Sequence, residues 1–307
     1  MPNLKDIKSR ILSVENTKKI TRAMKMVAAA KVKKAENSVK AGRPFSDELI
    51  KAFKKLLAAI GATAQDGQTI KMAIENYPEL LKKREVKTAG MLVITSNKGL
   101  AGAYNANIVR NVLKQIKENK ENGIESKLYI VGQKGISALK RKAADLNAEI
   151  IQTYVQVANE ISALGAENIA EDLANDYVAG KIDSIEVFTT KFKNMMSYSA
   201  QKWTLLPINP DEIEVETAEI EPVMVFEPSK STILQKIVPL YITNTIYQAL
   251  LEAQASELAS RMTAMSAASN NAEDMIRTLT IDYNKARQSA ITQEILEVVS
   301  GADALKG

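Results

Sequence analysis

The chain has 307 residues, enough for one large domain or for a domain with an extension. It contains neither Cys nor His, which excludes disulfides, thiolate nucleophiles, Cys-ligated zinc and imidazole bases. Residues 1–58 hold 15 Lys or Arg and 5 Asp or Glu, a local charge of +10 within a chain of net charge +5. Such a segment is either a solvated helix face or a basic rod that meets an acidic partner or nucleic acid.

The first predicted element is a long helix over residues 4–57, interrupted only by Gly42 and Pro44. Apolar residues at its start follow the 3, 4, 3 spacing of a coiled-coil seam, which Thr21, Met24, Ala28 and Val32 roughly continue; they are Leu4, Ile7, Ile11 and Val14. This helix therefore needs a partner along its length.

Between residues 86 and 206, short β-rich runs alternate with helical patterns. The predicted strands are 89–95, 127–132, 149–155 and 184–190, and the predicted helices are 105–120, 134–144 and 160–179. This alternation predicts an open, Rossmann-like α/β sheet with helices on its faces. The loop TSNKGLAGAYN (95–105) matches neither common phosphate-binding glycine motif, so we expect a structural strand-to-helix turn.

The last part of the chain predicts an extended connection followed by a second long helix. Residues 206–230 hold four of the eight prolines, and from residue 240 to 305 only Gly301 interrupts the helical pattern. We expect the two long helices to pair as an antiparallel coiled coil. The predicted segments are 1–58 (N-terminal shaft helix), 59–206 (central α/β domain with its entry segment), 207–230 (connection) and 231–307 (C-terminal shaft helix).

The stretch NKARQSAITQEILEVVSG (284–301) mixes polar and apolar side chains on nearly every helix face. Arg287, Glu294 and Val298 share one flank. Gln288, Thr292, Ile295 and Val299 share another. A terminus that is apolar this far round would be exposed unless another protein encloses it. We assign no catalytic, cofactor-binding or metal-ligating residue anywhere in the chain.

No apolar run approaches the roughly 20 residues that a bilayer crossing needs, and the charged opening MPNLKDIKSR lacks the apolar core of a secretory signal. We therefore expect a chain that reaches a membrane only through partners.

Three segments, residues 7–35, 94–108 and 259–305, resemble the gamma subunit of ATP synthase, the central rotor shaft of F-type ATPases. The resemblance implies a non-catalytic shaft inside a hexamer of alpha and beta subunits, bound to epsilon and to the membrane c-ring. It implies that ion flow turns the shaft and so drives ATP synthesis or hydrolysis at the beta sites. The location implied is the cytoplasmic face of a bacterial plasma membrane or an equivalent energy-coupling membrane.

The resemblance also assigns contact residues. Arg22, Met24 and Lys25 match the shaft region that faces the acidic lever loop of beta. Contacts to the catch loops of beta fall on Arg261, Gln288, Thr292 and Glu294. Together with Arg287, Ile295, Val298 and Val299, these residues form the expected surface toward the hexamer, and Phe226 and Glu227 match positions near the c-ring and epsilon.

Two other classes of function compete with this one. A coiled-coil nucleic-acid scaffold would use the basic first helix, and its binding would weaken steeply with salt; the few aromatic residues and the lack of a recognisable nucleic-acid module disfavour it. An independent enzyme is disfavoured by the missing His and Cys.

Overall fold

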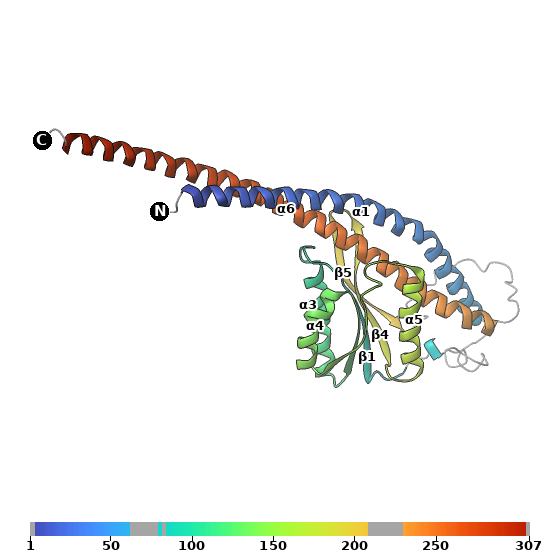
Figure 1. Ribbon diagram of the computed structural model, residues 1–307. Coiled ribbons are helices and arrows are strands. Elements are labelled where there is room, and N and C mark those ends of the chain that lie inside the picture. The colour runs from blue at the N-terminus through green and yellow to red at the C-terminus, as the bar shows by residue number, and fades with distance from the viewer. Residues whose placement is uncertain (1–3, 62–78, 82–83, 208–229, 305–307) are drawn as a thin grey trace. The chain divides into compact units, whose positions relative to one another are not determined.

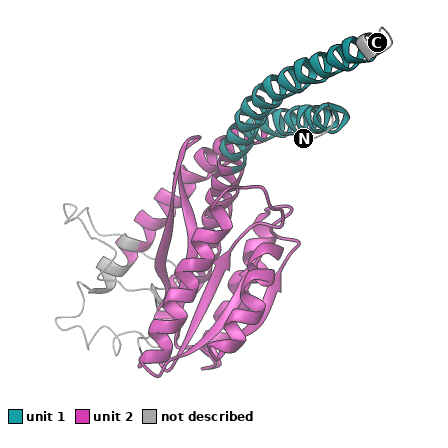
Figure 2. Cartoon of the chain, turned by 90° about the vertical axis from the view of Figure 1, so that its left-hand side faces the viewer, with its two compact units in different colours: residues 1–30, 261–307 teal, residues 31–260 magenta. Residues whose placement is uncertain are grey.

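The computed structural model describes residues 4–61, 79–81, 84–207 and 230–304 (Figure 1). The chain divides into two compact units: unit 1 comprises residues 1–30 and 261–307, and unit 2 comprises residues 31–260 (Figure 2). Helices α1 (Leu4–Gly61) and α6 (Lys230–Ala304) each contribute residues to both units.

Unit 2 contains a five-stranded sheet in the order β3-β2-β1-β4-β5. Pairing is parallel between β1 and β2, β2 and β3, and β1 and β4, and antiparallel between β4 and β5. The strands are β1 (Thr88–Ile94), β2 (Glu125–Val131), β3 (Ala148–Tyr154), β4 (Ser184–Asn194) and β5 (Ser197–Leu206). The other elements are the 3-10 turn η1 (Glu79–Leu81) and helices α3 (Tyr104–Glu121), α4 (Gln133–Asp145) and α5 (Ala163–Val178). The predicted mixed α/β fold is confirmed.

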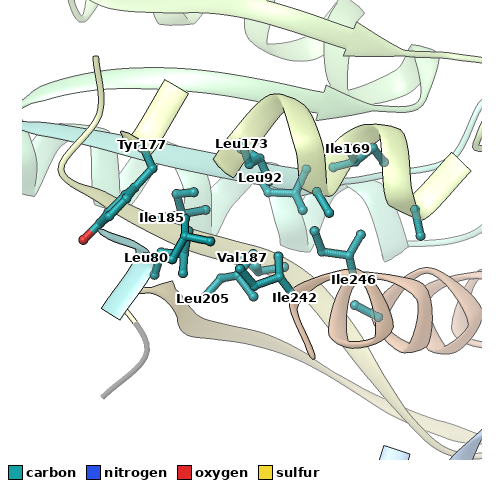
Figure 3. Close-up of a cluster of buried hydrophobic side chains, with 14 of the residues drawn as sticks. Leu80, Leu92, Ile169, Leu173, Tyr177, Ile185, Val187, Leu205, Ile242 and Ile246 are labelled. Carbon is teal, nitrogen blue, oxygen red and sulfur yellow. The ribbon is translucent and has the colours of Figure 1, made fainter. Parts of the chain in front are cut away.

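Both faces of the sheet are covered. Alternate residues of a strand point to opposite sides, so one strand contributes side chains to both cores. Met91 and Val93 of β1 pack into a core with α3 and α4. Leu92 and Ile94 pack into a second core with α5 and the first part of α6. Figure 3 shows this second core, in which Leu92, Ile169 and Ile242 come from the sheet, α5 and α6. Residues 234–253 of α6 are therefore part of the domain's own core.

Strand β5 was not predicted from the sequence. Its side chains are mostly exposed or half-buried until Leu205 and Leu206, so it lacks a regular apolar alternation. The turn before it, residues 194–197, carries no Gly or Pro. An edge strand of this kind gives a weak sequence signal.

Within unit 2, α1 and α6 lie antiparallel. Asn244 donates a buried hydrogen bond of 2.7 Å to the Ser46 hydroxyl, and Arg43 pairs with Glu252 at 3.7 Å. Buried residues of α1 in this unit repeat at spacings of 3, 4 and 7; they include Val32, Ala35, Val39, Ser46, Leu49, Phe53 and Leu56. The predicted pairing of the helices is confirmed, and α1 is continuous through Gly42 and Pro44. Pro44 is exposed, so the backbone acceptor it leaves unpaired can face water.

The loop after β1 is held by its own polar side chains. The Asn105 Oδ1 accepts from the Ser96 N–H at 3.0 Å. Asn97 accepts from the Gln133 N–H at 2.8 Å and donates to the Val155 carbonyl at 2.8 Å. These contacts join the loop to α3, to the start of α4 and to the segment after β3, which gives it a structural role.

Replacing Glu252 with Gln is expected to flatten the pH dependence of stability. Burial raises the pKa of the Glu252 carboxyl above its ordinary value, and this outweighs the opposite effects of Arg43, Lys191 and a hydrogen bond from the Phe192 N–H. The folded state thus holds the proton to higher pH than the unfolded state. The contribution of Glu252 to stability therefore falls as pH rises from the ordinary pKa of the carboxyl through its raised pKa in the folded state. Urea unfolding across about pH 4 to 7 measures the slope.

The control for this prediction is Glu36→Gln. A hydrogen bond from Lys40 is the main cause that lowers the pKa of Glu36, so the contribution of Glu36 is lost as pH falls. The two substitutions should change the slope in opposite directions. A change of the same sign in both variants would contradict the assignment.

Candidate partner interface

Unit 1 consists of the N-terminal part of α1 and the C-terminal part of α6 (Figure 2). Its buried side chains are few and mostly small, with Thr21 and Ala28 on α1 and Met265 and Ala272 on α6. Lys18 pairs with Glu273 at 3.1 Å. Small seam residues let two helix backbones approach closely, but they bury little apolar area. Most of the large apolar side chains of this unit therefore lie outside the seam between its two helix segments.

Part of this apolar surface lies on α1. Four side chains are more than half exposed: Leu12, Ile20, Met26 and Val27. They stand beside basic residues, since Arg22 and Lys25 are exposed and Met24 is half-buried between them. The N-terminal helix therefore presents a surface that is both apolar and positively charged. Sequence reasoning missed these four residues, although each is an apolar residue within two positions of the predicted seam.

The end of α6 is exposed on every side. All residues from 291 to 302 are exposed, and they include large apolar side chains such as Ile295 at 57% and Val298 at 72%. We call residues 291–299 the apolar tip; its exposed large apolar residues are Ile291, Ile295, Leu296, Val298 and Val299. Contiguous apolar surface of this kind is typical of protein interaction sites.

The predicted polar contacts lie on and just before this tip. Arg287, Gln288 and Glu294 are exposed. Thr292 is exposed too, and its hydroxyl donates to the Gln288 carbonyl at 2.9 Å. The donor of Thr292 is therefore used inside the helix, while its oxygen and the Gln288 side-chain amide still face outward. Spacing of four residues puts these two side chains on one face.

Two other groups of predicted residues fall elsewhere. Arg261 is half-buried at the first position of α6 that belongs to unit 1. Phe226 and Glu227 lie outside the described residues. The structure thus brings the C-terminal residues together and leaves the c-ring assignment as a prediction.

The part of the chain that the structure describes contains no group of three or more acidic side chains placed to hold a metal ion. None of its helices combines the length and apolarity that a bilayer crossing requires. Unit 1 presents a contact surface of apolar, basic and amide side chains.

Paired long helices with an exposed apolar tip define a class of protein, one that binds other proteins through that surface. A family model described as ATP synthase matches residues 3–305. The gamma chain of Synechococcus sp. (strain JA-3-3Ab) is 41% identical over 99% of this chain and 100% of its own length. That of Picosynechococcus sp. (strain ATCC 27264 / PCC 7002 / PR-6) is also 41% identical, with the same coverage. The chain belongs to the ATP synthase gamma chain family.

Solved structures show the same fold. The central stalk and c-ring structure of Tetrahymena thermophila mitochondrial ATP synthase contains a chain with 27% identity and a TM-score of 0.57, covering 81% of this chain and 99% of that one. The rotor of Euglena gracilis mitochondrial ATP synthase matches with a TM-score of 0.60 at 18% identity, over 94% of this chain and 98% of that one. The second likeness concerns the fold alone.

Proposed function

We propose that this chain is the central stalk subunit of an F-type ATP synthase. Its helix pair turns inside a hexamer of alpha and beta subunits, and its α/β domain connects through epsilon and the c-ring to ion flow across a membrane. The chain carries out no ATP chemistry itself; that chemistry belongs to the beta subunits. It lies on the cytoplasmic face of a bacterial plasma membrane or an equivalent membrane, which it reaches through its partners.

The observation that supports this proposal most is the exposed apolar tip in a chain of this family. To move one catalytic site from mostly closed to mostly open, shaft contacts must differ between the two states by about 5.5 kcal/mol. Exposed ion pairs contribute roughly 0 to 1 kcal/mol each, so Arg22 and Lys25 are too weak alone. Burying one large apolar side chain contributes about 1.5 to 3 kcal/mol, so the tip offers a larger source of binding energy.

Apolar and polar residues would serve different parts of the rotation. Apolar contact is nearly non-directional, so Ile295, Val298 and Val299 can centre a turning helix without favouring one angle strongly. Hydrogen bonds depend on angle, so Gln288 and the Thr292 oxygen are suited to hold the shaft transiently at particular positions. Arg261, Arg287 and Glu294 add charged contacts on the same helix.

The double substitution Ile295→Asp and Val298→Asp tests the role of the tip. In the free chain both positions are exposed, so the free energy of unfolding is expected to change by no more than about 0.5 kcal/mol. Assembly with alpha and beta is expected to weaken at least tenfold, because two charges would enter an apolar collar. Co-purification yield and ATP turnover of the assembled complex are the measurements.

Lys117→Asp, an exposed change on α3, is the matched control and should leave assembly intact. Gln288→Ala should preserve assembly but lower ATP turnover. If Gln288→Ala and the wild type hydrolysed ATP at equal rates, Gln288 would not be a residue that holds the shaft transiently. Normal assembly and turnover of the double variant would overturn the role of the tip, and a wild-type chain that never joins alpha and beta would overturn the proposed function.

A further inference from the structure

Strands β4 and β5 extend beyond the other strands of the sheet. β4 runs to Asn194, yet its pairing with β1 ends where Val93 meets Phe188. Beyond that point, β4 and β5 pair only with each other. Residues 189–201 therefore form a two-stranded ribbon, which we call the ribbon arm. An isolated two-stranded hairpin is marginally stable, so this arm needs a surface to pack on.

The surface is the helix pair within unit 2. Phe192 is 4% exposed and packs, with Met195, into a core formed with both long helices. The helix residues of this core are Val32, Ala35 and Val39 of α1 and Leu251, Ala255, Leu258 and Ala259 of α6. The arm thus contacts both helices at once.

Hydrogen bonds fix the position of the arm. The hydroxyls of Tyr198 and Ser260 are 3.0 Å apart, and Ser260 donates to the Ala101 carbonyl at 2.6 Å. One residue of α6 therefore links the arm and the loop after β1. Because hydrogen bonds are directional, this link resists sliding and rotation in a way that apolar packing alone does not.

The arm extends the attachment of α6 beyond the core that the sheet forms with this helix. The sheet already holds α6 through residues such as Ile242. This core reaches Ala253, and the core with the arm continues to Ala259, roughly 9 Å further along the helix at about 1.5 Å per residue. A longer attachment resists tilting of a helix better than a shorter one, and contact of the arm with α1 also resists rotation of the pair.

We infer that the ribbon arm is a torque strut: Phe192, Met195 and Tyr198 lock the helix pair to the α/β domain, so that rotation passes between them with little elastic loss. This role rests on the proposed rotary function, because a strut matters only if torque crosses this joint. The three residues are positioning residues.

The test is a single-molecule measurement on the chain assembled with alpha and beta. Because the chain has no Cys, Lys140→Cys on the exposed face of α4 gives one labelling position in this chain. With the hexamer fixed and the shaft stalled, the angular variance of a probe at that position reports the stiffness of the joint. Phe192→Ala and, to a smaller extent, Tyr198→Phe are expected to increase this variance, while ATP turnover without load stays near wild type.

Val112→Ala is the matched control. Val112, a residue of α3, is fully buried in the other core, which contains no residue of α1 or α6, so its truncation destabilises the domain without removing a side chain of the strut. Its variance should match that of wild type even if its melting temperature falls as far as that of Phe192→Ala. Phe192→Leu should restore part of the stiffness.

Equal variance for Phe192→Ala, Tyr198→Phe and Val112→Ala would overturn the strut while leaving the rotary function intact. A wild-type complex that does not rotate would instead overturn the proposed function.

Discussion

Replacing Gly132 with Ala is expected to lower the free energy of unfolding by roughly 3 to 5 kcal/mol. Gly132 joins β2 to α4 with a φ of 94°, a backbone conformation that other residues rarely adopt. A Cβ atom there would lie 2.3 Å from the Thr95 carbonyl oxygen and 2.7 Å from its carbon. Both are backbone atoms of the neighbouring β1 loop, so relief requires the two strand ends to separate. Urea unfolding of the purified chain gives the measurement.

Gly123→Ala is the control for this prediction. Gly123 also has a positive φ, 71°, but a Cβ atom there would meet nothing within 4 Å. The control thus carries the conformational strain without the collision and should cost about 1 to 2 kcal/mol. If the two variants were equally stable, close approach of the β1 loop would not be the reason that position 132 requires glycine.

Val32→Asp is expected to separate the helix pair near the ribbon arm. Val32 is fully buried in the core that α1 shares with α6 and Phe192. Placing a carboxylate there without a partner is expected to cost roughly 4 kcal/mol or more. If the proposed function holds, the variant should also fail to assemble with alpha and beta, because the paired helices are the part that enters the hexamer. Circular dichroism during thermal unfolding and co-purification test the two effects separately.

Ala30→Asp provides the same change of charge two residues earlier on an exposed position of α1. Its expected cost is the difference in helix propensity, about 0.7 kcal/mol at most. An equal loss of stability in both variants would mean that charge on α1, and not burial at Val32, controls the pairing.

The sequence predicted the main elements of the fold because their signals are local. Spacing of 3 and 4 residues identified α1 as one half of a helix pair, and the buried positions Ile7, Thr21, Ala28 and Val32 keep that spacing. Runs of β-branched and apolar residues identified the four strands β1 to β4. The family resemblance, carried by both ends and the loop after β1, is confirmed by the match over residues 3–305.

The sequence pointed to one part of the candidate interface and not to the other. Its C-terminal residues Ile295, Val298 and Val299 could be predicted because a helix that is apolar on all sides needs a partner. The exposed residues of α1, such as Ile20 and Met26, could not be separated from seam residues, since a sequence does not show which apolar side chains a partner helix leaves uncovered. Contacts to the subunits of the hexamer remain proposals.

Periodicity and composition by themselves determined that two long helices flank an α/β domain, because each signal is contained within a few helical turns or one strand. Only the tertiary structure decided that β5 completes the sheet and that the ribbon arm packs on both helices. Phe192 and Val32 share one core although 160 positions of sequence separate them. The hydroxyls of Tyr198 and Ser260 meet across 62 positions. Such pairings depend on how the finished elements fit in space, which no local pattern of residues encodes.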